Sequence, residues 1–245
     1  MNPRESITRQ IHGRLEREPR INLHRHPIAI SNADGVAILE GEVGDIAAKK
    51  LALELAASVA NVRGIVDRLR VAPGERRGDG AIRDSLARML LEQPEWRNCT
   101  IRSQVQEMRN SRTMVLRQGN HDSVGDMEIA VTDGVITLEG HVISLPHRLY
   151  AGVLAWWTPG RRDVVNALEL RPRYEERDDE VTEALGLVLE ADPAIDASQI
   201  RPSCAKWVVT LEGSVPSEEQ KRRAELDAWY LSGVERVINK LRIAA

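Results

Sequence analysis

Apolar side chains recur at every fourth position in three separate stretches of the chain. An isoleucine, leucine or valine stands at i, i+4 and i+8 in each: Ile7, Ile11 and Leu15; Ile82, Leu86 and Leu90; and Val181, Leu185 and Leu189. This spacing places the three side chains of a stretch on one face of a helix. A proline follows four residues after the last of them each time, at positions 19, 94 and 193. Because proline disfavours helical geometry in the residue before it, we expect all three helices to end there.

The tripeptide Leu-Glu-Gly also occurs three times, at residues 39–41, 138–140 and 211–213. Alternating apolar and polar residues lead into it, which is the pattern of a half-buried strand. In the first two copies Asp34-Gly35 or Asp133-Gly134 stands between two such segments, and an Asp-Gly pair there is a strong signal for a hairpin turn. The third copy has Lys206-Trp207 instead, so we expect a turn that is built differently or a strand that continues.

A second helix and a third strand are predicted after each Leu-Glu-Gly. Four residues after the glycine stands a residue of the kind that caps a helix N-terminus, namely Asp45, Ser144 or Ser217. Twenty residues after it comes a residue that tolerates a left-handed C-cap, namely Asn61, Gly160 or Gly233, and a β-branched segment follows. A frame that repeats in this way indicates one supersecondary module present in three copies.

The sequence therefore predicts an α+β protein of three tandem α-β-β-α-β units, each a three-stranded sheet with two helices on one face. We place the units at residues 1–72, 76–171 and 177–245. The segments between them are polar, charged and contain proline, as linkers tend to be.

The middle unit is longer than its neighbours. The proline that follows its first helical stretch and the glycine of its Leu-Glu-Gly tripeptide lie 46 positions apart. The same two residues lie 22 and 20 positions apart in the first and third units. The added segment, near residues 97–125, is rich in arginine: Arg97, Arg102, Arg109, Arg112 and Arg117. Residues 103–109 within it could form a short helix or an extra strand. Long insertions in compact domains are often functional, so a contact with an anionic partner is one interpretation, and a solvated or packed loop is the other.

The aromatic residues are few and stand in pairs. Trp156 and Trp157 follow the second Leu-Glu-Gly glycine by 16 and 17 positions, and Trp229 and Tyr230 follow the third by the same distances. Adjacent helical residues point about 100° apart, so one member of each pair should face the core. The other member could anchor the protein to a membrane or partner, although packing between units is the interpretation we favour.

Composition excludes several classes of function. The net charge is −3, whereas a protein that binds nucleic acid over its whole surface is normally basic. The two cysteines, six histidines and three Leu-Glu-Gly glutamates show no metal-ligand spacing, and no nucleophile motif or phosphate-binding loop is present. We therefore expect no enzymatic activity, no metal and no organic cofactor; a potassium site built from backbone carbonyls would leave no signature and stays open.

The repeated frame resembles the BON domain, the bacterial osmotically induced and nodulation domain. The resemblance rests on Asp-Gly-Val at 34–36 and 133–135, on Leu-Glu-Gly-x-Val, and on the closing segment at 234–239. It implies an α-β-β-α-β fold and a non-enzymatic role, usually the binding of phospholipid or envelope surfaces under osmotic stress. Potassium binding is linked to some members.

We accordingly predict a stress-associated binding protein that engages an anionic lipid surface or a protein partner, with a homo-oligomer as a further option. The candidate contact residues are Arg102, Arg109, Arg112, Arg117, Trp156 and Trp157. The alternatives are a potassium-sensing module and nucleic-acid binding through the arginine-rich insertion, of which nucleic acid is the less favoured partner. No signal peptide and no membrane-spanning segment is apparent, so we expect a cytoplasmic protein, with peripheral association at the inner membrane as an option.

Overall fold

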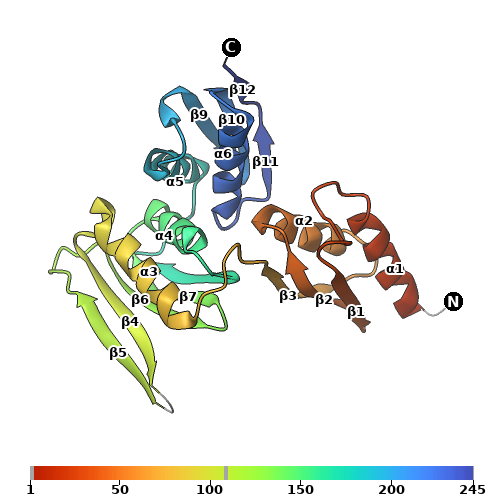
Figure 1. The fold of residues 1–245 in the computed structure, drawn as a ribbon, viewed down its shortest axis with the longest axis horizontal. Helices are drawn as coiled ribbons and strands as arrows, with labels where there is room; N and C mark the ends of the chain where they lie inside the picture. The colour runs from red at the N-terminus through yellow and green to blue at the C-terminus, as the bar shows by residue number, and fades with distance from the viewer. Residues whose placement is uncertain (1–2, 108–109, 245) are drawn as a thin grey trace. The chain divides into compact units, whose positions relative to one another are not determined.

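The computed structural model describes residues 3–107 and 110–244. The chain divides into two compact units, residues 1–72 and residues 73–245 (Figure 1). The first unit holds one α-β-β-α-β repeat and the second holds two. The predicted fold class is confirmed.

The first unit is a three-stranded sheet packed against two helices. Its elements are α1 (Pro3–Leu15), β1 (Ile28–Ala33), β2 (Val36–Val43), α2 (Ile46–Ala57) and β3 (Gly64–Val71). The strands β1 and β2 form the predicted antiparallel hairpin, and β3 returns parallel to β2 after the α2 crossover. The two helices pack against each other, and the apolar stripe of α1 lies fully buried at Ile11 and Leu15.

The second repeat carries a sheet of five strands instead of three. Its elements are α3 (Asp79–Glu92), the 3₁₀ turn η1 (Pro94–Trp96), β4 (Cys99–Glu107), β5 (Asn110–Arg117), β6 (Gly125–Thr132), β7 (Val135–Val142), α4 (Leu145–Trp157) and β8 (Asp163–Leu170). The strand order is β5-β4-β6-β7-β8. The strands β6, β7 and β8 are the predicted three, so the basic insertion supplies the other two.

The third repeat returns to the simple plan. Its elements are α5 (Asp178–Ala191), η2 (Ala197–Gln199), β9 (Ile200–Ala205), β10 (Val208–Val215), α6 (Glu218–Tyr230), β11 (Arg236–Asn239) and β12 (Arg242–Ile243). Both β11 and β12 pair in parallel with β10, so they are two parts of one interrupted strand.

The third hairpin turn has the geometry of the first two although it contains no glycine. Lys206 and Trp207 adopt φ angles of 52° and 60°, in the left-handed region that Asp-Gly pairs favour. The carboxylate of Asp178, at the start of α5, accepts hydrogen bonds from both backbone N–H groups, at 2.7 and 3.3 Å. In the second repeat Asp79, at the start of α3, accepts bonds from the turn residues Asp133 and Gly134 in the same way. The strand therefore does not continue through the turn.

Candidate functional site

The basic insertion folds as a hairpin that extends the sheet of the second repeat. Strand β4 lies parallel to β6, from the pair Cys99–Gly125 to the pair Ser103–Ile129, and β5 lies antiparallel to β4. The segment for which a helix or a strand was open is therefore a strand as far as Glu107. Strand β5 forms the new edge of the sheet, as the yellow-green strands at the lower left of Figure 1 show.

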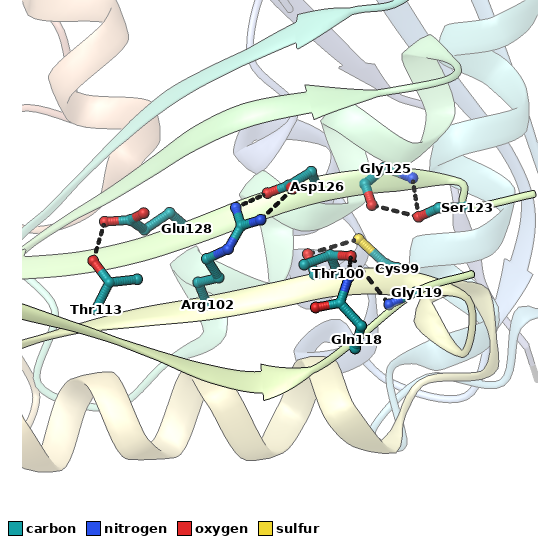
Figure 2. Close-up of polar contacts among 10 residues, drawn as sticks. All are labelled: Cys99, Thr100, Arg102, Thr113, Gln118, Gly119, Ser123, Gly125, Asp126 and Glu128. Carbon is teal, nitrogen blue, oxygen red and sulfur yellow. Dashed lines mark hydrogen bonds and ion pairs between the residues drawn. The ribbon is translucent and has the colours of Figure 1, made fainter. Parts of the chain in front are cut away.

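Arg102 ties the hairpin to the original sheet. Its guanidinium forms a two-pronged ion pair with Asp126 of β6: Nη1 bonds Oδ1, and Nη2 lies 2.7 Å from Oδ2 (Figure 2). Both side chains are about one-third exposed. A bidentate arginine–carboxylate pair is the strongest of the common ion-pair geometries, so Arg102 fixes the position of β4 on β6.

Arg117 connects the end of β5 to the end of α3 and to η1. Its Nη1 donates to the carbonyl oxygen of Trp96 at 2.9 Å, and its Nη2 donates to that of Leu91 at 2.7 Å. These carbonyls belong to the last turn of α3 and to η1, where backbone acceptors lack partners within the helix. The guanidinium of Arg117 is thus used inside the repeat.

Polar side chains at the base of the hairpin hold the chain where it leaves β5 and enters β6. Thr100 Oγ1 accepts a hydrogen bond from the backbone N–H of Gly119 at 3.0 Å, and Ser123 Oγ lies 2.6 Å from the carbonyl oxygen of Gly125 (Figure 2). Cys99 is buried beside them, and burial raises the pKa of its thiol to about 12. This thiol is therefore protonated at neutral pH and is no nucleophile.

The exposed part of the hairpin is the run from Arg112 to Val115. All four residues are exposed, with Met114 at 46% and Val115 at 57%. Among the side chains that the structure describes, none forms an ion pair or a hydrogen bond with the guanidinium group of Arg112. Arg109 lies outside those ranges.

The two tryptophans lie between the second and third repeats. Trp156 is buried and stacks on Tyr230 of α6, with the ring centroids 5.8 Å apart and the planes at 15°. Trp157 donates a hydrogen bond from Nε1 to Asp227 Oδ1 at 2.9 Å, and the guanidinium of Arg223 lies 5.9 Å from the centre of its ring. The structure thus brings Trp156 and Trp157 together at a helical contact, apart from the arginines of the hairpin.

A buried carboxyl pair completes this contact and was not predicted from the sequence. Asp227 is fully buried and Asp192 is 2% exposed. Arg223 Nε lies 2.5 Å from Asp192 Oδ2 and 3.9 Å from Asp227 Oδ1. Burial, together with the neighbouring Asp192, raises the pKa of Asp227 to about 8. The backbone N–H of Ala194 and the guanidinium of Arg223 outweigh burial at Asp192 and lower the pKa of that carboxyl.

A signal for Asp227 exists in the sequence. Its helix buries Ala224, Asp227 and Ala228, the i, i+3 and i+4 positions of one face, and the buried C-cap residue Leu231 follows at i+7. A single acid on an otherwise apolar face indicates a buried polar contact, because an unpaired buried charge is strongly unfavourable.

No group of three or more metal-ligating side chains occurs among the described residues. A hollow of about 520 Å³ lies beside the start of α3, but its charged lining residues are already bonded, Asp79 to the hairpin turn and Arg83 to Asp84. Within residues 3–107 and 110–244, no helix combines the length and the apolar character that crossing a bilayer requires.

Comparison with known proteins gives a family. The family model "BON domain" matches residues 3–73, 112–172 and 177–245; the second match begins within β5, so α3 and β4 precede it. Among solved structures, two structures of CdsD, a structural protein of the Type III secretion system of Chlamydia trachomatis, are similar to this chain; the first is of the C-terminal domain. Each has 13% sequence identity to this chain and a TM-score of 0.25. They cover 97% and 98% of this chain and 96% and 92% of their own. No curated protein matches. Since the three matched segments take in most of the chain, the protein belongs to the BON domain family, in three tandem copies.

Proposed function

We propose that this chain is a non-enzymatic, stress-associated binding protein whose β4–β5 hairpin contacts an anionic lipid surface. BON domains are associated with osmotic stress and with the binding of phospholipids. Three departures from the simple repeat, namely the basic composition of the insertion, its position at a sheet edge and its exposure, support the hairpin as the contact element.

The observation that carries the proposal is the exposed run on β5. Arg112 stands beside Met114 and Val115, and the acid that contacts this run is Glu128 of β6, whose Oε1 lies 3.5 Å from Thr113 Oγ1 (Figure 2). A cation next to uncovered apolar side chains suits an interface with anionic lipid, because headgroup attraction contributes about 1 kcal/mol per arginine and apolar burial about 25 cal/mol per Å². Arg102 and Arg117 have a supporting role in this proposal, since their guanidinium groups hold the hairpin in place.

The proposal is tested by co-sedimentation with vesicles at low salt. We expect binding to vesicles that contain phosphatidylglycerol, and little binding to pure phosphatidylcholine. Arg112→Ala should weaken the binding about fivefold, which is the loss of one arginine contact. Arg173→Ala is the matched control: this arginine is 82% exposed in the same unit but lies away from the hairpin sequence, and its removal should change little.

Equal sedimentation of the protein with both kinds of vesicle, or with neither, would contradict the proposal. An equal loss of vesicle binding from Arg112→Ala and Arg173→Ala would show that overall charge attracts the protein to the vesicle. The hairpin would then not be the contact element.

A further inference from the structure

Strand β5 has a longer run of exposed residues than the other edge strands of the described sheets; β3 comes nearest, with three consecutive exposed residues from Val66 to Arg68. In β1, β8 and β9 exposed and less exposed residues alternate, because helices cover one face of the sheet. In β5 four consecutive residues, from Arg112 to Val115, are exposed. Since neighbouring strand residues point to opposite faces, both faces of β5 are uncovered there, and its outer edge has no neighbouring strand.

An uncovered edge is a template for another strand. The backbone N–H and C=O groups along the outer side of β5 have no strand partner, and an extended segment could satisfy them by adding to the sheet. Natural proteins block such edges with proline, with a bulge or with charged side chains, especially lysine. Strand β5 contains no proline or lysine, and the one irregularity in its pairing lies at its far end, opposite Ile101 and Arg102.

The side chains of β5 select the chemistry of the added strand. Its charged residues are Arg112 and Arg117, and residues 110–117 contain no acid. Met114 and Val115 lie on opposite faces. An incoming strand is therefore favoured when it places a carboxylate beside Arg112 and apolar side chains beside Met114 and Val115. A second copy of β5 fits less well, because it would bring further arginines into the same junction.

We propose that β5 is a docking strand that accepts an acidic, partly apolar extended segment of a partner protein as the sixth strand of the sheet. The interaction uses backbone groups at the sheet edge, and so it does not depend on lipid binding by the hairpin.

The probe for this proposal is a fluorescent peptide with glutamate at every fourth position and valine at the others, added to the full chain, so that a glutamate beside Arg112 leaves valines beside Met114 and Val115. Its binding is followed by anisotropy and by the slowing of amide hydrogen exchange in β5. Two control peptides have lysine in place of glutamate, or the same sequence N-methylated at alternate amides so that one edge cannot donate. We expect the acidic peptide to bind and each control to bind about tenfold more weakly or less.

Two variants test the side chains. Arg112→Glu should reverse the preference, so that the lysine peptide binds better than the glutamate peptide. The pair Met114→Ser with Val115→Ser, both at exposed positions, removes the apolar side chains without adding charge and should weaken binding of the valine-containing peptide while circular dichroism shows the fold retained.

Several outcomes would overturn the docking strand. They are absence of binding by the acidic peptide, equal binding by the N-methylated peptide, and self-association of the chain that is lost in the double-serine variant. Binding to phosphatidylglycerol vesicles without any peptide binding would also overturn it, and would leave the lipid proposal standing. Peptide binding without vesicle binding would support the docking strand and contradict the lipid proposal.

Discussion

The glycine of each Leu-Glu-Gly tripeptide is fixed by the backbone of the neighbouring strand. These glycines adopt φ angles of 144°, 120° and 123°. A Cβ atom on them would lie 2.5, 2.1 and 1.9 Å from the carbonyl oxygens of Pro27, Asp126 and Gln199. A carbon atom cannot approach a backbone oxygen so closely, so only glycine fits. The repeat could therefore be recognised from the sequence, because this backbone contact admits a single residue type.

Gly213→Ala should lower the free energy of unfolding by about 3 kcal/mol, because the backbone must move away from Gln199 and alanine disfavours the positive φ. Gly186→Ala is the matched control. Gly186 lies within α5, and a Cβ there meets nothing within 4 Å. This change should stabilise the protein by up to about 1 kcal/mol, since alanine is the better helix former. Urea unfolding of both variants measures the difference, and similar effects of the two changes would refute the steric explanation.

At the scale of elements, the sequence predicted what depends on nearby residues and missed what depends on distant ones. Helix stripes, prolines and Asp-Gly turns are local signals, and the three helices end two to four residues before the prolines that were expected to stop them. The third turn was predicted only as one of two alternatives, because Lys206-Trp207 is poor turn chemistry and its stabilising carboxylate, Asp178, lies 28 residues away. The hairpin of the insertion likewise depends on the pair Arg102–Asp126, which spans 24 residues.

The third turn carries strain that a substitution can remove. Lys206 holds a φ of 52°, a region in which most side chains cost about 1 to 2 kcal/mol and asparagine costs less. Lys206→Asn should therefore raise the free energy of unfolding by about 1 kcal/mol. Lys206→Ala removes the same side chain without relieving the backbone, so it should give no gain. Thermal or urea unfolding distinguishes them, and a gain from alanine equal to that from asparagine would attribute the effect to the lysine charge.

At the scale of the whole molecule, the aromatic pairs explain which repeats share a unit. Trp156 of the second repeat stacks on Tyr230 of the third, and these residues belong to the two pairs that the sequence places at equivalent positions. The first repeat has Ala57 and Ser58 there, and it forms a compact unit of its own. Sequence showed that the pairs exist, but it did not show that they meet, because contacts between repeats leave no periodic pattern.

The contact between these two repeats should respond to pH through Asp227. Its carboxyl is enclosed by Trp157 of α4, by Arg223 on its own helix and by Asp192 at the end of α5. Burial raises its pKa to about 8, whereas an unfolded aspartate titrates near its usual value of 3.8. The unfolded chain therefore releases this proton first. The stability that protonated Asp227 contributes is complete below about pH 4, falls as the pH rises, and is lost above about pH 8.

Asp227→Asn should remove this dependence. The amide is neutral at every pH, its oxygen can accept the bond from Trp157, and its nitrogen can donate to Asp192. Relative to the native chain, the variant should therefore gain stability between about pH 5 and pH 8, by up to about 1.4 kcal/mol for each pH unit. Asp196→Asn is the control. The hydroxyl and backbone N–H of Ser198 lower the pKa of Asp196, so both folded and unfolded states are ionised in this range and the difference should stay constant. Unfolding by urea across the pH series measures both, and parallel curves for the native chain and Asp227→Asn would show that the buried carboxyl is ionised in the folded protein.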